Sequence, residues 1–99
     1  MNDIDCEQRE VLVAIKEVIR DFCPRAMPGD ARMNFETMDG KMDVHVKWRN
    51  GKLINMVLWV DNKQGYIRVN KDGTMLLKAF GFEQVFETLE AMKAFLEML

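Results

Sequence analysis

Residues 42–60 have the sequence MDVHVKWRNGKLINMVLWV, and this stretch predicts a β-hairpin. Apolar and polar side chains alternate before the turn, which is typical of a strand with one buried face. Asn50-Gly51 favours a two-residue type I′ turn, because such a turn needs positive φ at both central residues. Loop length sets which residues face each other, so the turn also predicts a register. The expected pairs are Arg49 with Lys52, Trp48 with Leu53, Val46 with Asn55 and Val44 with Val57.

Three further turn signals flank this hairpin at strand-length intervals. Asp39-Gly40 favours another two-residue turn, while residues 62–65 and 70–73 each match a type I turn closed by a glycine bulge. Four turns divide the middle of the chain into five strands of an antiparallel meander. The strands are expected at about 32–38, 41–49, 52–61, 66–70 and 74–80. The further expected pairs are Phe35 with Val44, Met33 with Val46, Trp59 with Val69, Val69 with Met75 and Ile67 with Leu77.

Residues 5–22 predict an amphipathic helix. Asp5 is a suitable N-cap, and Gln8 stands three residues later, where it completes a capping box. Pro24 cannot continue the helix, so residues 23–31 are expected to form a loop. The apolar stripe expected to face the sheet comprises Val11, Leu12, Ile15, Val18, Ile19 and Phe22.

The last segment is predicted to be helical, but its first helical residue has two interpretations. Apolar residues keep a helical period from Phe82 to Leu99, which favours a helix through the whole segment. Alternatively, Thr88 is the N-cap and residues 82–87 form an extended approach. Both interpretations include a helix over residues 88–98.

Together these elements predict an α+β fold in one domain, residues 1–99. We expect two layers, a five-stranded antiparallel meander with the N- and C-terminal helices packed on one face. The alternative is one helix on each face, which would bury both faces. In the first arrangement the core face holds Met33, Phe35, Met42, Val44, Val46, Trp48, Leu53, Val57, Trp59, Ile67, Val69, Met75 and Leu77.

The opposite face of the sheet, the open face, is the predicted functional surface. In the expected register the third strand contributes an apolar row to it, which consists of Ile54, Met56, Leu58 and Val60. Neighbouring strands add Tyr66, Leu76 and Phe80, with Met38 at the far edge. The basic residues around the row are Arg32, Lys41, Lys47, Arg49, Lys52, Arg68 and Lys78, and the only expected carboxylates are Glu36 and Asp43. An exposed apolar patch of this kind is typical of an association surface. The residues assigned to partner binding are Ile54, Met56, Leu58, Val60, Tyr66, Arg68, Leu76 and Phe80.

This surface leads to two functional hypotheses. The first is a non-enzymatic protein-interaction module, such as a small regulator, chaperone or inhibitor of a larger machine, of a size that phages and mobile elements also encode. It would use the open face to form a homodimer, the commonest soluble oligomer, or to dock a protein partner. The alternative is single-stranded nucleic-acid binding, with bases stacked on Tyr66 and Phe80 beside Arg68 and Lys78. The aliphatic side chains of the apolar row suit a protein better than a base, so the first hypothesis is preferred.

Few residues support an enzyme or a metal site. The chain contains no serine, which excludes a serine nucleophile. Cys23 and the single histidine, His45, could form a thiol–imidazole pair, but they are expected on opposite sides of the sheet. One histidine and two distant cysteines provide no cluster of metal ligands. We therefore expect no catalytic residues, no metal and no other cofactor.

Charge and cysteine content also restrict the location and the partners. The formal net charge of −2 argues against bulk nucleic-acid or membrane binding. No stretch approaches the roughly 18 apolar residues of a membrane-spanning helix. Cys6 and Cys23 flank the first helix and would lie about 25 Å apart at a rise of about 1.5 Å per residue, beyond disulfide reach. Two free thiols favour a cytoplasmic location.

Overall fold

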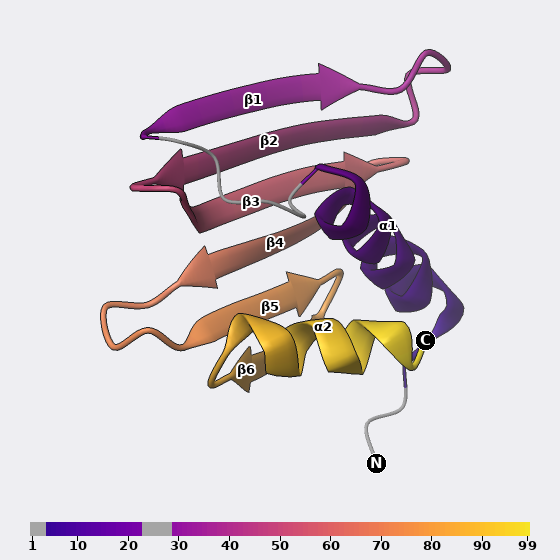
Figure 1. Cartoon of the computed structure of the whole chain (residues 1–99). Coiled ribbons are helices and arrows are strands. Elements are labelled where there is room, and N and C mark those ends of the chain that lie inside the picture. Colours follow the sequence, from indigo (N-terminus) through magenta and orange to yellow (C-terminus); the bar gives the residue numbers. More distant parts are fainter. Residues whose placement is uncertain (1–3, 23–28) are drawn as a thin grey trace.

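In the computed structural model, which describes residues 4–22 and 29–99, an antiparallel sheet carries two helices. The elements are α1 (Cys6–Phe22), β1 (Ala31–Glu36), β2 (Met42–Arg49), β3 (Lys52–Val60), β4 (Lys63–Val69), β5 (Met75–Ala79), β6 (Phe82–Phe86) and α2 (Leu89–Glu97). The strands follow one another in chain order across the sheet. Both helices lie on the same side of it (Figure 1), which confirms the two-layer α+β fold.

The sheet has six strands, so the expected number of five is wrong. The missed turn is Phe80-Gly81, where φ is 45° and 97°. Phenylalanine rarely adopts positive φ, so this turn lacks the Asn or Asp that marks the others. The strand after it, β6, occupies the extended approach of the second interpretation. Thr88 caps α2, and its hydroxyl accepts a hydrogen bond from the Ala91 amide at 3.0 Å.

The first helix begins as its capping box predicts. The Gln8 amide donates to the Asp5 carboxylate at 2.7 Å, and the Asp5 amide donates to the Gln8 side-chain oxygen at 3.2 Å. α1 crosses β3, β4 and β5 and also contacts α2, which packs against β6. Five members of the predicted stripe are buried against the sheet: Val11, Leu12, Ile15, Val18 and Ile19. The side chain of Phe22 lies outside the described residues.

Two of the predicted registers are confirmed. β1 and β2 pair Met33 with Val46 and Phe35 with Val44 as predicted. The two-residue turn expected at Asp39-Gly40 is wrong, because only Gly40 has positive φ, 71°, and its amide donates to the Thr37 carbonyl at 3.0 Å in a longer loop. β4 and β5 pair Ile67 with Leu77 and Val69 with Met75 around the turn at residues 70–73. In that turn Gly73 has a φ of 90°, as expected for a glycine bulge. Within it, hydrogen bonds from the Thr74 hydroxyl and amide lower the pKa of Asp72 below its usual value.

The register of β3 differs from the prediction because of a β-bulge. Asn50-Gly51 forms the expected turn, with φ of 53° and 76°. Trp48 pairs with Leu53 as expected, but Lys47 then pairs with Asn55, so Ile54 is the extra residue. Beyond the bulge every side chain of β3 points to the face opposite to the expected one. The observed pairs are Val46 with Met56, Val44 with Leu58 and Met42 with Val60, so the predicted pairs of Val46 with Asn55 and of Val44 with Val57 are wrong.

The physical reason for the bulge is the position of Asn55. In the expected register Asn55 would point into the core between Leu53 and Val57, and its amide would need a buried partner. The bulge places Asn55 on the open face between Lys47 and Arg68. It also buries Met56 and Leu58 in place of Val57 and Trp59. The bulge thus keeps the amide out of the core.

The connection between β3 and β4 also differs from the prediction. Asp61-Asn62 forms a two-residue turn with φ of 48° and 68°, in place of the expected turn at residues 62–65. Trp59 therefore pairs with Gln64, and its expected pairing with Val69 is wrong. Gly65 becomes a strand residue that lies directly under α1. A Cβ at Gly65 would stand 2.5 Å from Cγ1 of Val11, so the helix approaches this strand closely because no side chain intervenes.

Candidate functional site

The bulge removes the apolar row from the open face. Met56 and Leu58 are 0% exposed and Val60 is 9% exposed, and all three belong to the core between the sheet and the helices. Their assignment to an exposed partner-binding surface is therefore wrong, because the extra residue Ile54 inverts the strand. Ile54 itself is half-buried at the bulge.

Four of the eight predicted site residues do lie together on the open face. Arg68 pairs with Leu76, and Tyr66 pairs with Lys78, so β4 and β5 present these side chains side by side. Phe80 follows at the end of β5, and its amide donates to the Gln64 carbonyl at 3.0 Å. None of the described residues covers this face, since both helices lie on the other side (Figure 1).

A row of three cationic side chains and one amide crosses four strands of the open face. Successive register pairs place Arg32, Lys47, Asn55 and Arg68 next to one another from β1 to β4, and we call these four residues the basic row. Leu76 and Val85 continue the same line on β5 and β6. No carboxylate interrupts the basic row, and its three cations make no ion pair with any residue that the structure describes.

Three aromatic side chains occupy the neighbouring part of the open face. Trp59 on β3 is 36% exposed, Phe80 after β5 is 45% exposed, and Tyr66 on β4 is half-buried. We call these three residues the aromatic cluster. Sequence reasoning assigned Trp59 to the core, and the polar Asn55 at a supposed core position was the signal that could have placed it correctly. The polar side chain of Gln64 stands between Trp59 and Phe80.

Two members of the aromatic cluster, Tyr66 and Phe80, border a shallow hollow with a volume of about 500 Å³. Its lining consists of Asn62, Gln64, Tyr66, Lys78, Phe80, Gly81 and Glu83, so it includes one carboxylate. The Lys78 ammonium lies 5.7 Å from the centre of the Tyr66 ring. Flat π surfaces beside amide donors and acceptors and a cation are the groups that contact unstacked nucleobases.

The His45 side chain contacts the tryptophan of this cluster. Its ring meets the Trp59 ring edge to face, with the centroids 5.7 Å apart and an angle of 88° between the planes. Nδ1 of His45 lies 2.8 Å from the Asn34 side-chain oxygen, and Nε2 lies 3.3 Å from the Asp43 carboxylate. The histidine is on the open face as expected. Cys23, which was expected on the opposite side of the sheet from His45, lies outside the described residues.

One carboxylate lies near the basic row, since Asp30 lines a shallow hollow with Arg32 and Lys47 and accepts a hydrogen bond from the Asn50 amide at 3.0 Å. The other carboxylates of the open face lie apart from the row. Glu36 and Asp43 face each other at the end of β1 and β2 near residues 37–41. Glu83 also belongs to this face, which corrects the expectation of only two carboxylates, because β6 pairs it with Lys78. The Lys78 and Glu83 charged groups are 3.6 Å apart. The face is therefore basic along one row and mixed in charge beyond it.

Comparisons with known protein families, with curated proteins and with solved structures found no match for this chain. Within residues 4–22 and 29–99, no helix is long and apolar enough to cross a membrane. The same described ranges contain no group of three or more His, Cys, Asp or Glu side chains that could hold a metal ion.

Proposed function

We propose that this protein is a non-enzymatic module that binds single-stranded nucleic acid across the open face of its sheet. The observation that carries this proposal is the arrangement of two sets of side chains. Three exposed or half-exposed aromatic rings stand on neighbouring strands, and a row of three cations without a carboxylate runs beside them. Three of the four residues of the aliphatic row that favoured a protein partner, Met56, Leu58 and Val60, are part of the core instead.

The aromatic cluster supplies the stacking surfaces. Trp59, Tyr66 and Phe80 belong to three consecutive segments of the sheet, so their rings are spread over about two strand spacings, roughly 10 Å. Stacking of a base on an aromatic side chain contributes about 1–3 kcal/mol and tolerates any base. Bases in a duplex are already stacked on one another, so this surface favours a single strand.

The basic row supplies the contacts with phosphate. Arg32 and Arg68 are three strand spacings apart, about 14 Å, with Lys47 between them. Three phosphate contacts on a single strand predict that log K falls with log salt with a slope of about −2. The exposed arginines need no rearrangement to reach a phosphate, because the described residues leave them without an ion pair.

The overall charge of −2 is compatible with this proposal because the charges are unevenly distributed. Glu87, Glu90 and Glu97 lie in and just before α2, on the side of the sheet away from the basic row. A polyanion would therefore be attracted more strongly to the basic row than to the acidic α2. We place this activity in the cytoplasm, because the exposed Cys6 is a free thiol.

Fluorescence anisotropy with labelled oligo(dT) tests the proposal. We expect binding at low salt, with Trp59→Ala and Tyr66→Ala each weakening the affinity roughly five- to a hundredfold. Arg68→Gln should weaken it and reduce the salt slope by about 0.7. Met98→Ala is the control, since Met98 is an 85% exposed apolar residue outside the sheet. Absence of binding at low salt, or equal affinities for wild type and both aromatic variants, would refute the proposal.

A second candidate is docking of an acidic protein surface on the same face. Leu76 and Val85 pair at the end of the basic row, and Val85 is 56% exposed, so an apolar pair adjoins the cations. Stacking two copies face to face would bring two basic rows together, so this candidate favours a foreign partner over a homodimer. Val85→Asp should abolish protein docking and leave oligo(dT) binding within twofold. A dimer by light scattering that Val85→Asp converts to monomer would favour self-association instead.

A further inference from the structure

The strand β1 forms one outer edge of the sheet. It pairs with β2 on one side and with no other strand among the described residues. α1 crosses β3, β4 and β5 while α2 packs against β6, so both helices lie away from this edge (Figure 1). The outer edge of a sheet presents backbone donors and acceptors with which a strand of another chain can pair.

Alternate residues of β1 direct their backbone groups outward from this edge. The Thr37 amide donates to the Met42 carbonyl at 2.8 Å, so the backbone of Thr37 faces β2. Residues two apart in an antiparallel strand direct their N–H and C=O groups to the same side. The odd-numbered residues of β1 therefore bond to β2, and the backbone groups of Arg32, Asn34 and Glu36 point away from the sheet.

The charges of these outward residues are not compensated within the chain. Arg32 faces Lys47 of β2, and Glu36 faces Asp43. Like charges directly opposite each other on two strands repel. Neither Arg32 nor Glu36 makes an ion pair with any residue that the structure describes, including Asp30, which lines a hollow with Arg32. Each end of β1 would therefore gain from an opposite charge on its outer side.

A second copy of the chain supplies these opposite charges in one register. When two β1 strands pair antiparallel about Asn34, Arg32 of each copy faces Glu36 of the other. These are the residues whose backbone groups point outward, so backbone hydrogen bonding and charge favour the same register. Registers centred on Arg32 or on Glu36 would instead place like charges opposite each other. On the helix side of the sheet, the half-buried Met33 of one copy then faces Phe35 of the other.

The opposite edge of the sheet offers no such match. β6 contains a single charged residue, Glu83, whose carboxylate already lies 3.6 Å from the Lys78 ammonium. Two β6 strands paired antiparallel would have no opposite charge to set against Glu83 in either copy. The charge pattern therefore favours β1 over β6.

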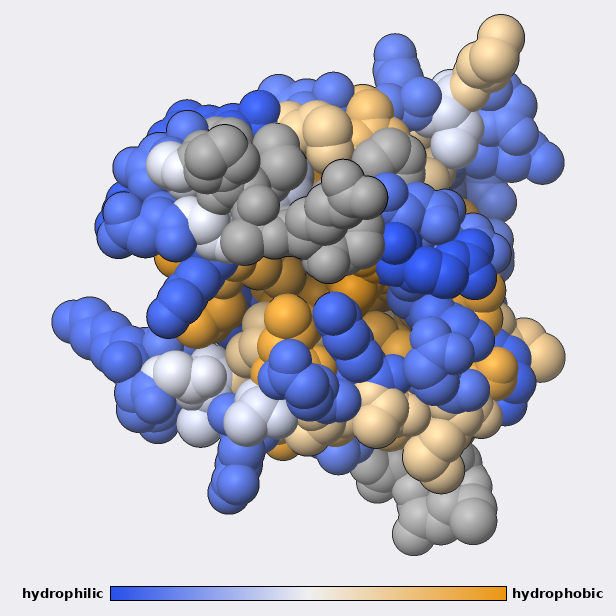
Figure 2. Space-filling view, in the orientation of Figure 1, coloured by the Kyte–Doolittle hydropathy of each residue, from blue (hydrophilic) through white to orange (hydrophobic). Residues whose placement is uncertain are grey.

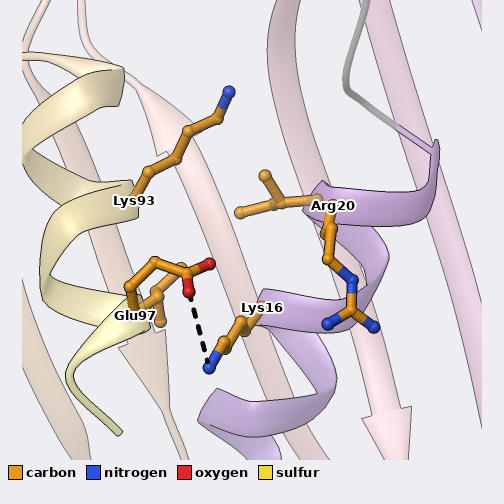
Figure 3. Close-up of a pocket in the computed structure, with 6 residues that line it drawn as sticks. Lys16, Arg20, Lys93 and Glu97 are labelled. Atoms are coloured by element: carbon orange, nitrogen blue, oxygen red, sulfur yellow. Dashed lines mark ion pairs between the residues drawn. The ribbon is translucent and has the colours of Figure 1, made fainter.

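The helical side also offers little surface for a second copy. Figure 2 shows a hollow on this side with hydrophilic side chains around it. Ile19 and Leu96 line the hollow between the helices, but they are only 4% and 1% exposed, so covering them would bury little further apolar area. Figure 3 shows the ammonium groups of Lys16 and Lys93 at opposite ends of this hollow, and Lys16 already pairs with Glu97 at 3.9 Å.

We propose that the protein forms a homodimer in which the β1 strands of two copies pair antiparallel about Asn34 and join two sheets into one. The contact is two-fold symmetric, so the pair of Arg32 with Glu36 occurs twice and the assembly closes at two copies. One pair of strands makes a small interface, and we expect a dissociation constant of about 10 µM to 1 mM. The dimer is independent of the proposed nucleic-acid binding, for which Lys47 and Arg68 of the basic row remain without an ion pair.

Sedimentation velocity at up to about 1 mM protein, without nucleic acid, tests the dimer through an exchange of charges. Arg32→Glu or Glu36→Arg alone sets like charges against each other twice in the dimer and should raise the dissociation constant at least about tenfold. The variant with both substitutions restores opposite pairs and should dimerise within about threefold of the wild type. Lys71→Glu is the matched control, because it makes the same charge change at an exposed lysine in the turn between β4 and β5. It should dimerise as the wild type does.

Amide hydrogen exchange locates the contact. The amides of Arg32, Asn34 and Glu36 point outward in the monomer, so their protection should rise with protein concentration, while the amides of β6 should not change. Circular dichroism establishes that each variant is folded. A wild type that stays monomeric at about 1 mM would overturn the proposal. A dimer that neither single substitution weakens, a double variant no better than the single ones, or protection that rises at β6 in place of β1 would overturn it as well.

Discussion

The two faces of the sheet differ most clearly along β3, where neighbouring residues have opposite environments. Met56 and Leu58 are fully buried under α1, whereas Val57 is half-buried and Trp59 is 36% exposed on the open face. The described core contains no buried polar or charged residue, while the open face mixes aromatic, cationic and amide side chains. We therefore expect substitutions on the helix-covered face to change the free energy of unfolding most. We assign the proposed binding function to the open face.

The largest effect should come from placing a charge on each face of β3 in turn. Met56→Asp would bury a carboxylate that has no partner, at a cost of about 4 kcal/mol or more. Val57→Asp places the same carboxylate on the open face beside His45 and Tyr66, where water reaches it, and should cost roughly 1 kcal/mol. Urea unfolding followed by circular dichroism measures both changes.

The register of β3 determines which of these two substitutions is more destabilising. Val57→Asp serves as the matched control for Met56→Asp, because it makes the same kind of change one residue away. If Val57→Asp were the more damaging variant, β3 would have the unbulged register, and the open face would carry Met56 in place of Trp59.

A smaller difference is expected when side chains are shortened on the two faces. Leu58→Ala removes a fully buried side chain and should reduce the free energy of unfolding by about 2–5 kcal/mol. Trp59→Ala removes a larger side chain but should cost about 1 kcal/mol, because its ring is partly in water and mainly contacts His45. Chemical denaturation of the two variants checks the order. A larger loss for Trp59→Ala would mean that Trp59 belongs to the core.

The sequence predicted the fold where turn chemistry was unambiguous. Asn50-Gly51 and the turn at residues 70–73 have residues that accept positive φ, and both turns formed as expected. The turn at Phe80-Gly81 was missed because phenylalanine gives no such signal. The turn at Asp61-Asn62 was missed because glycine favours turns, and Gly65 therefore placed the predicted turn at residues 62–65. In the structure Gly65 is a strand residue packed against α1.

The candidate site was predicted only in part, because one bulge residue reverses a whole strand. The basic row depends on β1, β2 and β4, whose side chains were placed correctly, so Arg32, Lys47 and Arg68 were found. Trp59 was missed since its orientation depends on Ile54 being the extra residue. A bulge after a well-formed turn leaves no local signature. The requirement that Asn55 avoid the core was the one available indication.

The last comparison concerns Gly65, the one position of β4 where the helix-covered face has no side chain. Gly65→Ala would place a Cβ 2.5 Å from Cγ1 of Val11 and 3.0 Å from Cδ1 of Ile15, so α1 must move away. We expect a loss of about 1–3 kcal/mol from this overpacking. Since Gly65 does not have positive φ, backbone strain adds nothing.

A double-mutant cycle isolates the steric part of this loss. Val11→Ala removes the methyl group that a Cβ at residue 65 would meet first. In that background Gly65→Ala should cost less than it does alone, with a coupling energy of about 0.5–3 kcal/mol between the two sites. Strictly additive losses would show that α1 does not rest on Gly65, and the close packing of helix on strand would then need another explanation. Coupling, in contrast, would establish that the absence of a side chain at Gly65 sets how closely α1 approaches the sheet.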